Sequence, residues 1–367
     1  MKRNFALIFM LTLILLMTAC SSTGDSTTDS SSSTTDEDSV SSDNLNSTII
    51  WRRFDDSFQS GFRIIMQNEA EDIGGITLDM QDGEDDPVKT NNKLETALTK
   101  GTTSIAICAP DRECTSELMN KCKAEDVPVV FFNMEPMEDT MEAYDKIYYV
   151  GANADESGDM CAQALINYWN KNTEIADKNG DGIMQIVVLQ GEIGQQDVII
   201  RTQAYEDTLK ANGIEYEILA IDTANWDQAQ ALDKMNTWIT SFGLDSIEGV
   251  LCNNDAMAMG AVQAALNNGY NKGEADKFMP IVGIDATVEA LQSMKDGALL
   301  GTVLNDRSGQ SRAIISTLKA LDAGQEINES IFDVECTVDG KYIWVPYVIV
   351  DDTNLDQTLE LMTEVES

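Results

Sequence analysis

The sequence predicts an α/β protein of the doubly wound type, in which parallel strands alternate with helices. From about residue 48, short runs of apolar, often β-branched residues alternate with amphipathic segments of helix length. Apolar residues follow one another directly in these runs, which is typical of strands buried on both faces of a parallel sheet. Repeated strand and helix units predict helices on both faces of such a sheet. The length of 367 residues allows about two domains.

The predicted elements follow in order along the chain. Strands are predicted at residues 104–108, 127–132, 186–189, 216–221, 249–252, 280–284, 300–304 and 348–350. Helices are predicted at residues 115–125, 156–170, 200–211, 226–241, 257–267 and 308–323. No G-x-G-x-x-G or Walker A loop follows any of these strands, so the pattern does not indicate a dinucleotide or nucleoside triphosphate site.

Residues 1–19 are predicted to be a lipoprotein signal peptide. Lys2 and Arg3 precede the apolar run Phe5–Met17, which is too short to span a bilayer stably. The run ends at Met17-Thr-Ala-Cys20, which resembles the bacterial lipobox, in which the cysteine is lipidated. An ordinary signal peptide with an incidental cysteine is the alternative. We expect Cys20 to anchor the protein at the extracytoplasmic face of the bacterial cell membrane.

Residues 20–47 are predicted to form a disordered tether behind this anchor. Residues 21–47 are mostly Ser, Thr and Asp, with six acidic and no basic side chains. So little apolar surface is available for burial that the segment has nothing to offset its chain entropy. A flexible polar tether of this kind lets a folded domain stand off a membrane.

The composition excludes several classes of function. The chain has 63 Asp plus Glu against 24 Lys plus Arg, a formal net charge of −39, which argues against nucleic-acid binding. It has no histidine, which excludes Ser-His-Asp and Cys-His catalysis and His-ligated zinc. The six cysteines after Cys20 have no metal-type C-x-x-C spacing, and their disulfide state cannot be assigned from the sequence. Any bound metal should be a hard cation held by oxygen atoms.

Polar, planar side chains follow the predicted strands at the points where the strands end. They are Asn133, Asp222, Asn253, Asn254, Asp255, Asp285, Asn305 and Asp306. Ligands of open α/β sheets bind at the carboxyl ends of strands, so several such ends together indicate a small molecule rich in hydroxyl groups. Each of these residues could instead cap a helix, and we expect this of Asp255 and Asp306. Asp197 and Arg201 lie four residues apart on one helix face, as a surface ion pair or as groups pointing into a cleft.

Residues 177–185 have the spacing of an EF-hand calcium loop. Oxygen-bearing side chains occupy loop positions 1, 3, 5 and 9, at Asp177, Asn179, Asp181 and Gln185. Gly182 permits the sharp turn at position 6, and the Ile183 carbonyl is available at position 7. Position 12 is Val188 rather than glutamate, so the bidentate carboxylate must come from elsewhere. A plain polar turn explains the Asp-Gly dipeptide but not the complete spacing, and we expect a structural calcium ion.

These segments resemble the periplasmic galactose/glucose-binding protein family, and the matches are collinear over the chain after the tether. The matching segments are residues 54–58, 127–133, 148–151, 222–227, 253–261, 301–306 and 345–347. The resemblance implies a type I periplasmic-binding-protein fold, with two doubly wound parallel-sheet lobes joined by a three-segment hinge. The N-terminal lobe would comprise residues 48–152 plus 305–345, and the C-terminal lobe residues 153–304 plus 346–367.

The resemblance also implies the site. Phe58 and Trp226 would lie on the two faces of a hexose ring, and Glu248 would supply the distant calcium ligand. The polar groups around the sugar would be Asp56, Asn133, Asp197, Arg201, Asn254, Asp285 and Asn305. The family has a histidine where this chain has Gln195, so the preference between galactose, glucose and a related hexose is open.

The implied function is a substrate-binding lipoprotein, not an enzyme, that delivers the hexose to the transmembrane subunits of an ABC permease. A sugar sensor acting on a chemoreceptor or on a sensor kinase of a two-component system is an alternative that the sequence does not separate from transport. A glycoside-processing enzyme using Asp56 and Asp197 is a further, less favoured alternative.

Overall fold

The computed structural model describes residues 45–367; the predicted signal peptide, Cys20 and residues 21–44 of the predicted tether lie outside the described part. The predicted tether boundary at residue 47 is wrong, because β1 (Leu45–Trp51) begins at Leu45. The sequence misleads here because β1 contains polar residues that are buried. Ser47 is 1% exposed, and its hydroxyl oxygen lies 2.6 Å from that of Ser104 on the neighbouring strand β3.

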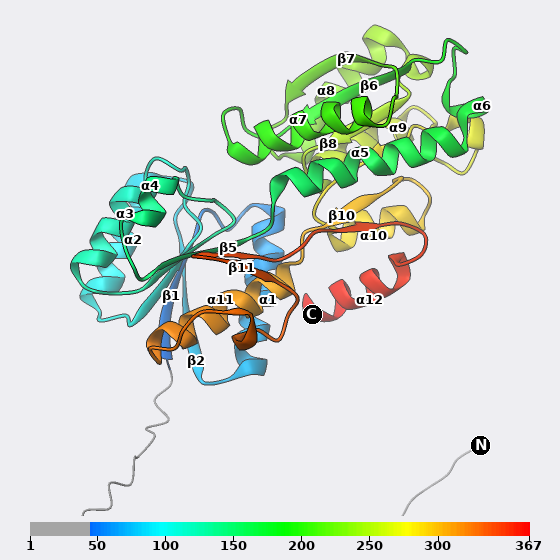
Figure 1. Ribbon diagram of the computed structural model, residues 1–367. Helices are drawn as coiled ribbons and strands as arrows, with labels where there is room; N and C mark the ends of the chain where they lie inside the picture. Colours follow the sequence, from blue (N-terminus) through cyan, green and yellow to red (C-terminus); the bar gives the residue numbers. More distant parts are fainter. Residues whose placement is uncertain (1–44) are drawn as a thin grey trace, which may run out of the picture. The chain divides into compact units, whose positions relative to one another are not determined.

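One sheet has seven strands in the order β11-β12-β5-β4-β3-β1-β2 (Figure 1). Its other strands are β2 (Ile76–Asp82), β3 (Ser104–Ile107), β4 (Val129–Phe132), β5 (Ile147–Gly151), β11 (Thr337–Asp339) and β12 (Tyr342–Trp344). All neighbouring strands of this sheet are parallel except β11 and β12, which are antiparallel. The helices of this part are α1 (Ser57–Ile73), α2 (Pro87–Thr99), α3 (Thr115–Ala124), α4 (Glu138–Glu142) and α11 (Arg307–Asp322). We call this part the N-terminal lobe.

A second sheet has the order β7-β6-β8-β9 and is parallel throughout. Its strands are β6 (Met184–Gln190), β7 (Tyr216–Thr223), β8 (Gly249–Cys252) and β9 (Ile281–Val282). β10 (Thr302–Leu304) continues it through isolated bridges and pairs antiparallel with β13 (Val348–Val350). The helices of this C-terminal lobe are α5 (Ala154–Lys171), α6 (Thr173–Ala176), α7 (Gln196–Ala211), α8 (Gln228–Phe242), α9 (Asp255–Asn267), α10 (Val288–Lys295) and α12 (Leu355–Val365). Short 3-10 turns occupy Leu244–Ser246, Ala275–Lys277 and Glu329–Ile331.

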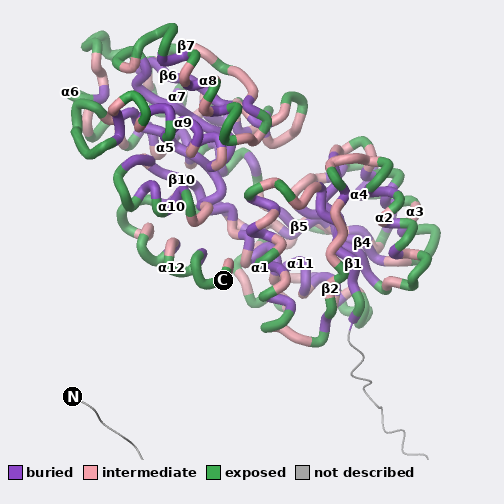
Figure 2. The backbone as a smooth tube through the Cα atoms, turned by 180° about the vertical axis from the view of Figure 1, so that it is seen from behind, coloured by how far each residue is buried: buried purple, intermediate pink, exposed green. Residues whose placement is uncertain are grey.

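Both faces of each sheet are covered by helices, which explains the unbroken apolar runs. In β1, Ile49 packs in the core that contains Phe62 of α1, whereas the next residue, Ile50, packs in the core that contains Leu94 of α2. Successive side chains of a strand point to opposite faces, so a strand covered on both sides needs apolar residues at consecutive positions. Figure 2 shows the buried residues concentrated in the strands of both lobes.

The chain passes between the lobes in the connections β5 to α5, β10 to α11 and β12 to β13. These connections lie close to residues 152, 304 and 345, where the prediction divides the lobes. The predicted fold class, a two-lobed α/β protein with parallel sheets, is confirmed. Within residues 45–367 no helix combines the length and the apolar character needed to cross a bilayer.

Candidate functional site

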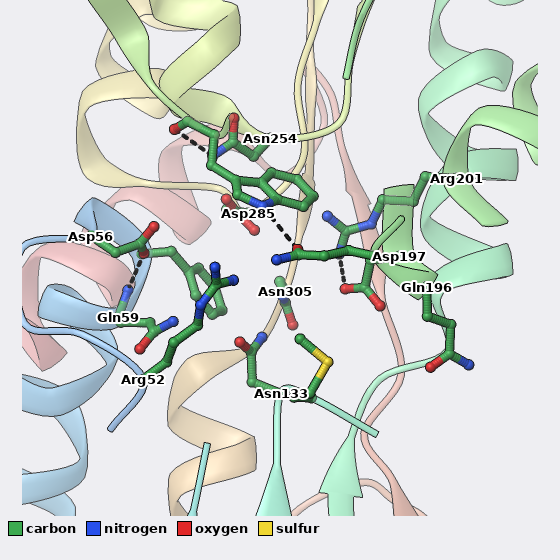
Figure 3. Close-up of a pocket in the computed structure, with 14 residues that line it drawn as sticks. Arg52, Asp56, Gln59, Asn133, Gln196, Asp197, Arg201, Asn254, Asp285 and Asn305 are labelled. Atoms are coloured by element: carbon green, nitrogen blue, oxygen red, sulfur yellow. Dashed lines mark hydrogen bonds and ion pairs between the residues drawn. The ribbon is translucent and has the colours of Figure 1, made fainter. Parts of the chain in front are cut away.

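One pocket collects all ten side chains that the sequence predicts for sugar binding. They are Asp56, Phe58, Asn133, Gln195, Asp197, Arg201, Trp226, Asn254, Asp285 and Asn305. They come from both lobes, and Figure 3 labels seven of them, among them Asp56 and Asn133 of the N-terminal lobe and Asp197 and Asp285 of the C-terminal lobe. The space among these side chains is about 570 Å³, part of which is open to solvent.

Four further residues line the pocket and were missed by the sequence analysis: Arg52, Gln59, Met134 and Gln196. Arg52 directly follows β1, so it lies at a strand end like the predicted residues, but the polar start of β1 conceals this strand in the sequence. Gln59 and Gln196 lie in the first turns of α1 and α7 and carry no distinguishing sequence signal.

The two aromatic residues of the pocket are supported by their neighbours. The Phe58 ring is 7% exposed and makes an edge contact with Phe62, with ring centroids 5.8 Å apart. The Trp226 indole lies against Gly191, where an added Cβ would come within 2.2 Å of the ring. Any side chain at Gly191 would therefore displace Trp226. The pocket has two apolar ring surfaces held in place by packing, among polar groups that point to the same space.

Three of the predicted site residues have positive φ angles although they are not glycine. The values are 61° for Asn133, 63° for Trp226 and 132° for Asp285. Such conformations cost free energy and persist only where the surroundings impose them, and they are enriched at functional sites. In this protein they direct the side chains that follow β4, β7 and β9.

Arg201 is held in the pocket wall by a fixed set of partners. Its Nε donates to Ser157 Oγ at 3.1 Å, Nη1 to the Asn253 carbonyl at 2.7 Å, and Nη2 to the Tyr347 hydroxyl at 2.8 Å. Asp197 Oδ2 lies 3.5 Å from Nη2, so the predicted i,i+4 pair is present. Arg201 is 3% exposed, and the pair is therefore part of the pocket rather than a surface ion pair.

Of the two residues expected to cap helices, Asp306 does so and Asp255 does not. Asp306 caps α11, because its Oδ1 accepts the Gly309 N–H at 2.9 Å. Asp255 does not cap α9; Asn254 does, accepting the Met257 N–H at 3.0 Å. Asp255 is instead fully buried and accepts from Thr302 Oγ1 at 2.6 Å and from the Thr287 N–H at 2.8 Å. Only the tertiary structure brings these threonines to the carboxylate.

Burial raises the pKa of two carboxyl groups at this end of the C-terminal sheet. Loss of hydration raises the pKa of Asp255 to about 6, against its hydrogen bonds from Thr302 and Thr287, which lower it. The pKa of Asp285 is raised well above its ordinary range, first by burial and then by the charge of Asp255. The pocket-lining Asp285 therefore binds a proton more readily than an exposed aspartate.

The residues of the predicted calcium loop also lie together. Asp177 accepts backbone N–H groups of Gly180 and Gly182 at 2.7 and 3.0 Å, and the side chains of Asn179 and Gln185 both reach Asp181 Oδ2 at 3.0 Å. Glu248, which is fully buried, accepts the N–H groups of Lys178 and Gln185 at 2.7 and 3.1 Å.

This loop fits a hard cation through mixed oxygen donors. Carboxylates, side-chain amides and the Ile183 carbonyl are the ligand types that calcium takes in such loops. No group of three or more His, Cys, Asp or Glu side chains that could hold a metal occurs in residues 45–367, so the amide and carbonyl oxygens would have to complete the set. Burial raises the pKa of Glu248, which a bound cation would offset. The cysteines of the described part are all free thiols.

The protein has two α/β lobes built on parallel sheets, with a pocket of polar and aromatic side chains at the strand ends. These features define the class of periplasmic-type ligand-binding proteins. A family model described as "Periplasmic binding protein domain" matches residues 48–326. The chain is 36% identical to the D-galactose/methyl-galactoside binding periplasmic protein MglB of Haemophilus influenzae, over 88% of this chain and 94% of that protein. It is 29% identical to a putative rhizopine-binding protein of Rhizobium meliloti, over 82% of this chain and 88% of that protein.

Solved structures agree on the fold. A galactofuranose-binding protein has a TM-score of 0.73 at 18% identity, covering 88% of this chain and all of that one (100%). An ABC transporter solute-binding protein from Bacillus halodurans with bound myo-inositol has a TM-score of 0.71 at 21% identity, covering 87% and 98%. The chain belongs to the periplasmic binding protein domain family, and the predicted resemblance is confirmed. The family consists of extracytoplasmic binding proteins, which also confirms the expectation that the chain is not an enzyme.

Proposed function

We propose that the protein is the substrate-binding lipoprotein of an ABC importer and binds D-galactose, D-glucose or a close hexose. The observation that carries this proposal is one pocket that combines Phe58 and Trp226 with polar groups from both lobes. Aromatic faces suit the C–H surfaces of a pyranose, and carboxylates, amides and a guanidinium suit its hydroxyl groups. The similarity to a galactose-binding relative supports the hexose class.

The mechanism that we propose is closure of the two lobes on the sugar. Asp56 and Asn133 belong to the N-terminal lobe, whereas Asp197 and Asp285 belong to the C-terminal lobe. A sugar that contacts both sets binds the closed arrangement more tightly than the open one, so it shifts the population toward closure. Hydroxyl-binding groups left unpaired by a wrong epimer cost free energy, which gives selectivity.

The direct test is a thermal-shift panel of monosaccharides with calcium present, followed by calorimetry on each sugar that raises the melting temperature. We expect D-galactose or D-glucose to stabilise the protein, because a ligand that binds only the native state raises its stability. No shift and no heat with any hexose would reject the sugar assignment. A role in transport predicts that sugar uptake needs the protein; an effect on chemotaxis or on sensor-kinase output alone would favour the sensing alternative.

The proposal includes a structural calcium ion and a lipid anchor. Asp177, Asn179, Asp181, Gln185, Glu248 and the Ile183 carbonyl would hold a calcium ion that ties the loop before β6 to the segment before β8. Cys20 would carry a lipid that keeps the protein at the extracytoplasmic face of the membrane, beside the permease. Replacing Cys20 by serine should release the protein from the membrane fraction and remove the lipid mass from its N-terminal peptide.

A further inference from the structure

Arg52 links the two lobes at the pocket. It follows β1 of the N-terminal lobe, and its Nη2 lies 2.6 Å from Glu192 Oε2, in the loop after β6 of the C-terminal lobe. Asp85 binds the same guanidinium and shares Nη2 with Glu192, accepting from Nε at 2.6 Å and from Nη2 at 3.0 Å. Arg52 is 7% exposed, so these contacts fix its position within the pocket wall.

Glu192 also fixes the side chain of Gln195. Nε2 of Gln195 donates to Glu192 Oε2 at 2.7 Å, and Oε1 of Gln195 accepts the indole N–H of Trp226 at 3.0 Å. An indole N–H only donates and a carboxylate only accepts, so turning the amide around would lose both bonds. Gln195 therefore keeps one N–H and one carbonyl lone pair for a ligand, in a set orientation.

One guanidinium nitrogen of Arg52 is left for a ligand. Within residues 45–367 no hydrogen bond or ion pair reaches Nη1, although both other nitrogens are engaged. Figure 3 shows the guanidinium of Arg52 directed toward the interior of the pocket that it lines. The two negative charges of Asp85 and Glu192 exceed the single positive charge of Arg52. A neutral ligand oxygen is therefore favoured over a carboxylate next to Nη1.

We propose that Arg52 is a further specificity-determining residue, whose Nη1 donates to one oxygen of the sugar, and that Glu192 is a positioning residue for Arg52 and Gln195. The proposal rests on the hexose-binding function proposed above. It implies that the oxygen bound by Arg52 is a neutral hydroxyl. If that oxygen is O6, the corresponding uronic acid should be rejected, because its carboxylate would face Asp85 and Glu192.

The test is calorimetry of D-galactose, D-glucose, their single-deoxy derivatives and the two uronic acids with Arg52→Met and Glu192→Gln, alone and combined. The wild type should bind one deoxy sugar about tenfold or more weakly than the parent hexose, because that sugar lacks the oxygen that accepts a charge-assisted hydrogen bond from Arg52. Arg52→Met should bind that deoxy sugar as well as its parent. The affinity losses of the two variants should not multiply in the double variant, since the residues act as a pair. Arg63→Met is the matched control, because Arg63 lies over the Phe54 ring and does not line the pocket.

The outcomes separate this inference from the function on which it rests. If the wild type binds no hexose, the proposed function fails and the inference fails with it. If the wild type binds a hexose but Arg52→Met keeps the wild-type ratio for every deoxy sugar, the contact with Arg52 is refuted. Multiplicative losses in the double variant also overturn it. Uronic acids that bind as well as the hexoses overturn it when the 6-deoxy sugar is the one that loses affinity. Arg52→Lys keeps the charge without the planar fork and should lose the same discrimination, which covers the case in which Arg52→Met does not fold.

Discussion

Oε1 of Glu366 lies 2.6 Å from Nη2 of Arg307, and this ion pair joins the end of α12 to the beginning of α11. Arg307 is 1% exposed, and its guanidinium lies 5.6 Å from the centroid of the Phe58 ring. Nε and Nη2 of Arg307 and Oε1 of Glu366 make no hydrogen bond within the part of the chain that the structure describes, so the two charges interact as an ion pair without hydrogen-bond geometry. Glu366 therefore neutralises a buried charge next to a wall of the pocket.

Replacing Glu366 by Gln should lower the free energy of unfolding by about 1–3 kcal/mol, because it leaves the Arg307 charge buried without a counter-ion. Hexose affinity should also fall, since Arg307 packs on Phe58. Denaturant unfolding and calorimetry would measure both effects, with Glu364→Gln, at an exposed position on α12, as the control. Equal unfolding midpoints for the two variants would contradict this role of the ion pair.

Trp226 should report hexose binding through its fluorescence, because it is the tryptophan among the residues that line the pocket. In Trp226→Phe the sugar-dependent change should disappear, and the affinity should fall by about tenfold because the larger ring and its bond to Gln195 are lost. Trp344→Phe is the control, since Trp344 stacks on Tyr342 outside the pocket. A sugar-dependent signal that survives in Trp226→Phe would place its origin elsewhere.

Removal of calcium should lower the melting temperature of the protein. An ion present at 100 times its dissociation constant stabilises the native state by about 2.7 kcal/mol. Scanning calorimetry with and without a chelator measures the effect, and Glu248→Gln should abolish the response to the chelator. Glu174→Gln, an exposed carboxylate just before the loop, should respond like the wild type. An unchanged wild-type melting temperature, after metal analysis has verified removal, would refute the calcium site.

Asp255 should make the stability depend on pH between about 4 and 6. Its pKa is raised from an ordinary 3.8 to about 6 in the folded protein, mainly by burial, while hydrogen bonds from Thr302 and Thr287 and the charge of Arg307 oppose the rise. In this interval the folded state binds more protons at Asp255 than the unfolded state, so the contribution of this group to stability falls as pH rises. Below pH 4 both states are protonated, and above about pH 6 to 7 both are ionised.

Urea unfolding of the wild type and of Asp255→Asn from pH 4 to 8 checks this dependence. The stability of the wild type relative to the variant should be greatest at pH 4, fall toward pH 6 and then level off. A relative stability that rises with pH, or that stays constant, would show that the Asp255 pKa is not raised by burial.

The apolar runs and the residues at strand ends predicted four residues of the pocket, Asn133, Asn254, Asp285 and Asn305. Asp56, Phe58, Gln195 and Trp226 were expected only from the family resemblance. Parallel strands present their carboxyl ends at one edge of a sheet, so residues far apart in the chain, such as Asn254 after β8 and Asp285 after β9, are brought to predictable places. Arg201 could be predicted because its distance from Asp197 is a local property of a helix. The start of β1 could not be predicted, because Ser47 is polar. Its burial depends on a hydrogen bond between its hydroxyl group and that of Ser104, 57 positions away in the chain.

The sequence by itself determined the α/β architecture, the strand-end residues and the spacing of the calcium loop, because these depend on local periodicity and on the order of residues. The tertiary structure decided which groups are left free to bind. Glu192, Arg52 and Gln195 form one hydrogen-bonded chain only because β1 and the loop after β6 meet at the pocket. Asp255 became a buried carboxylate rather than a cap for the same reason, since Thr302 supplies its hydrogen bond from another strand. Such pairings depend on distances in space that no sequence interval encodes.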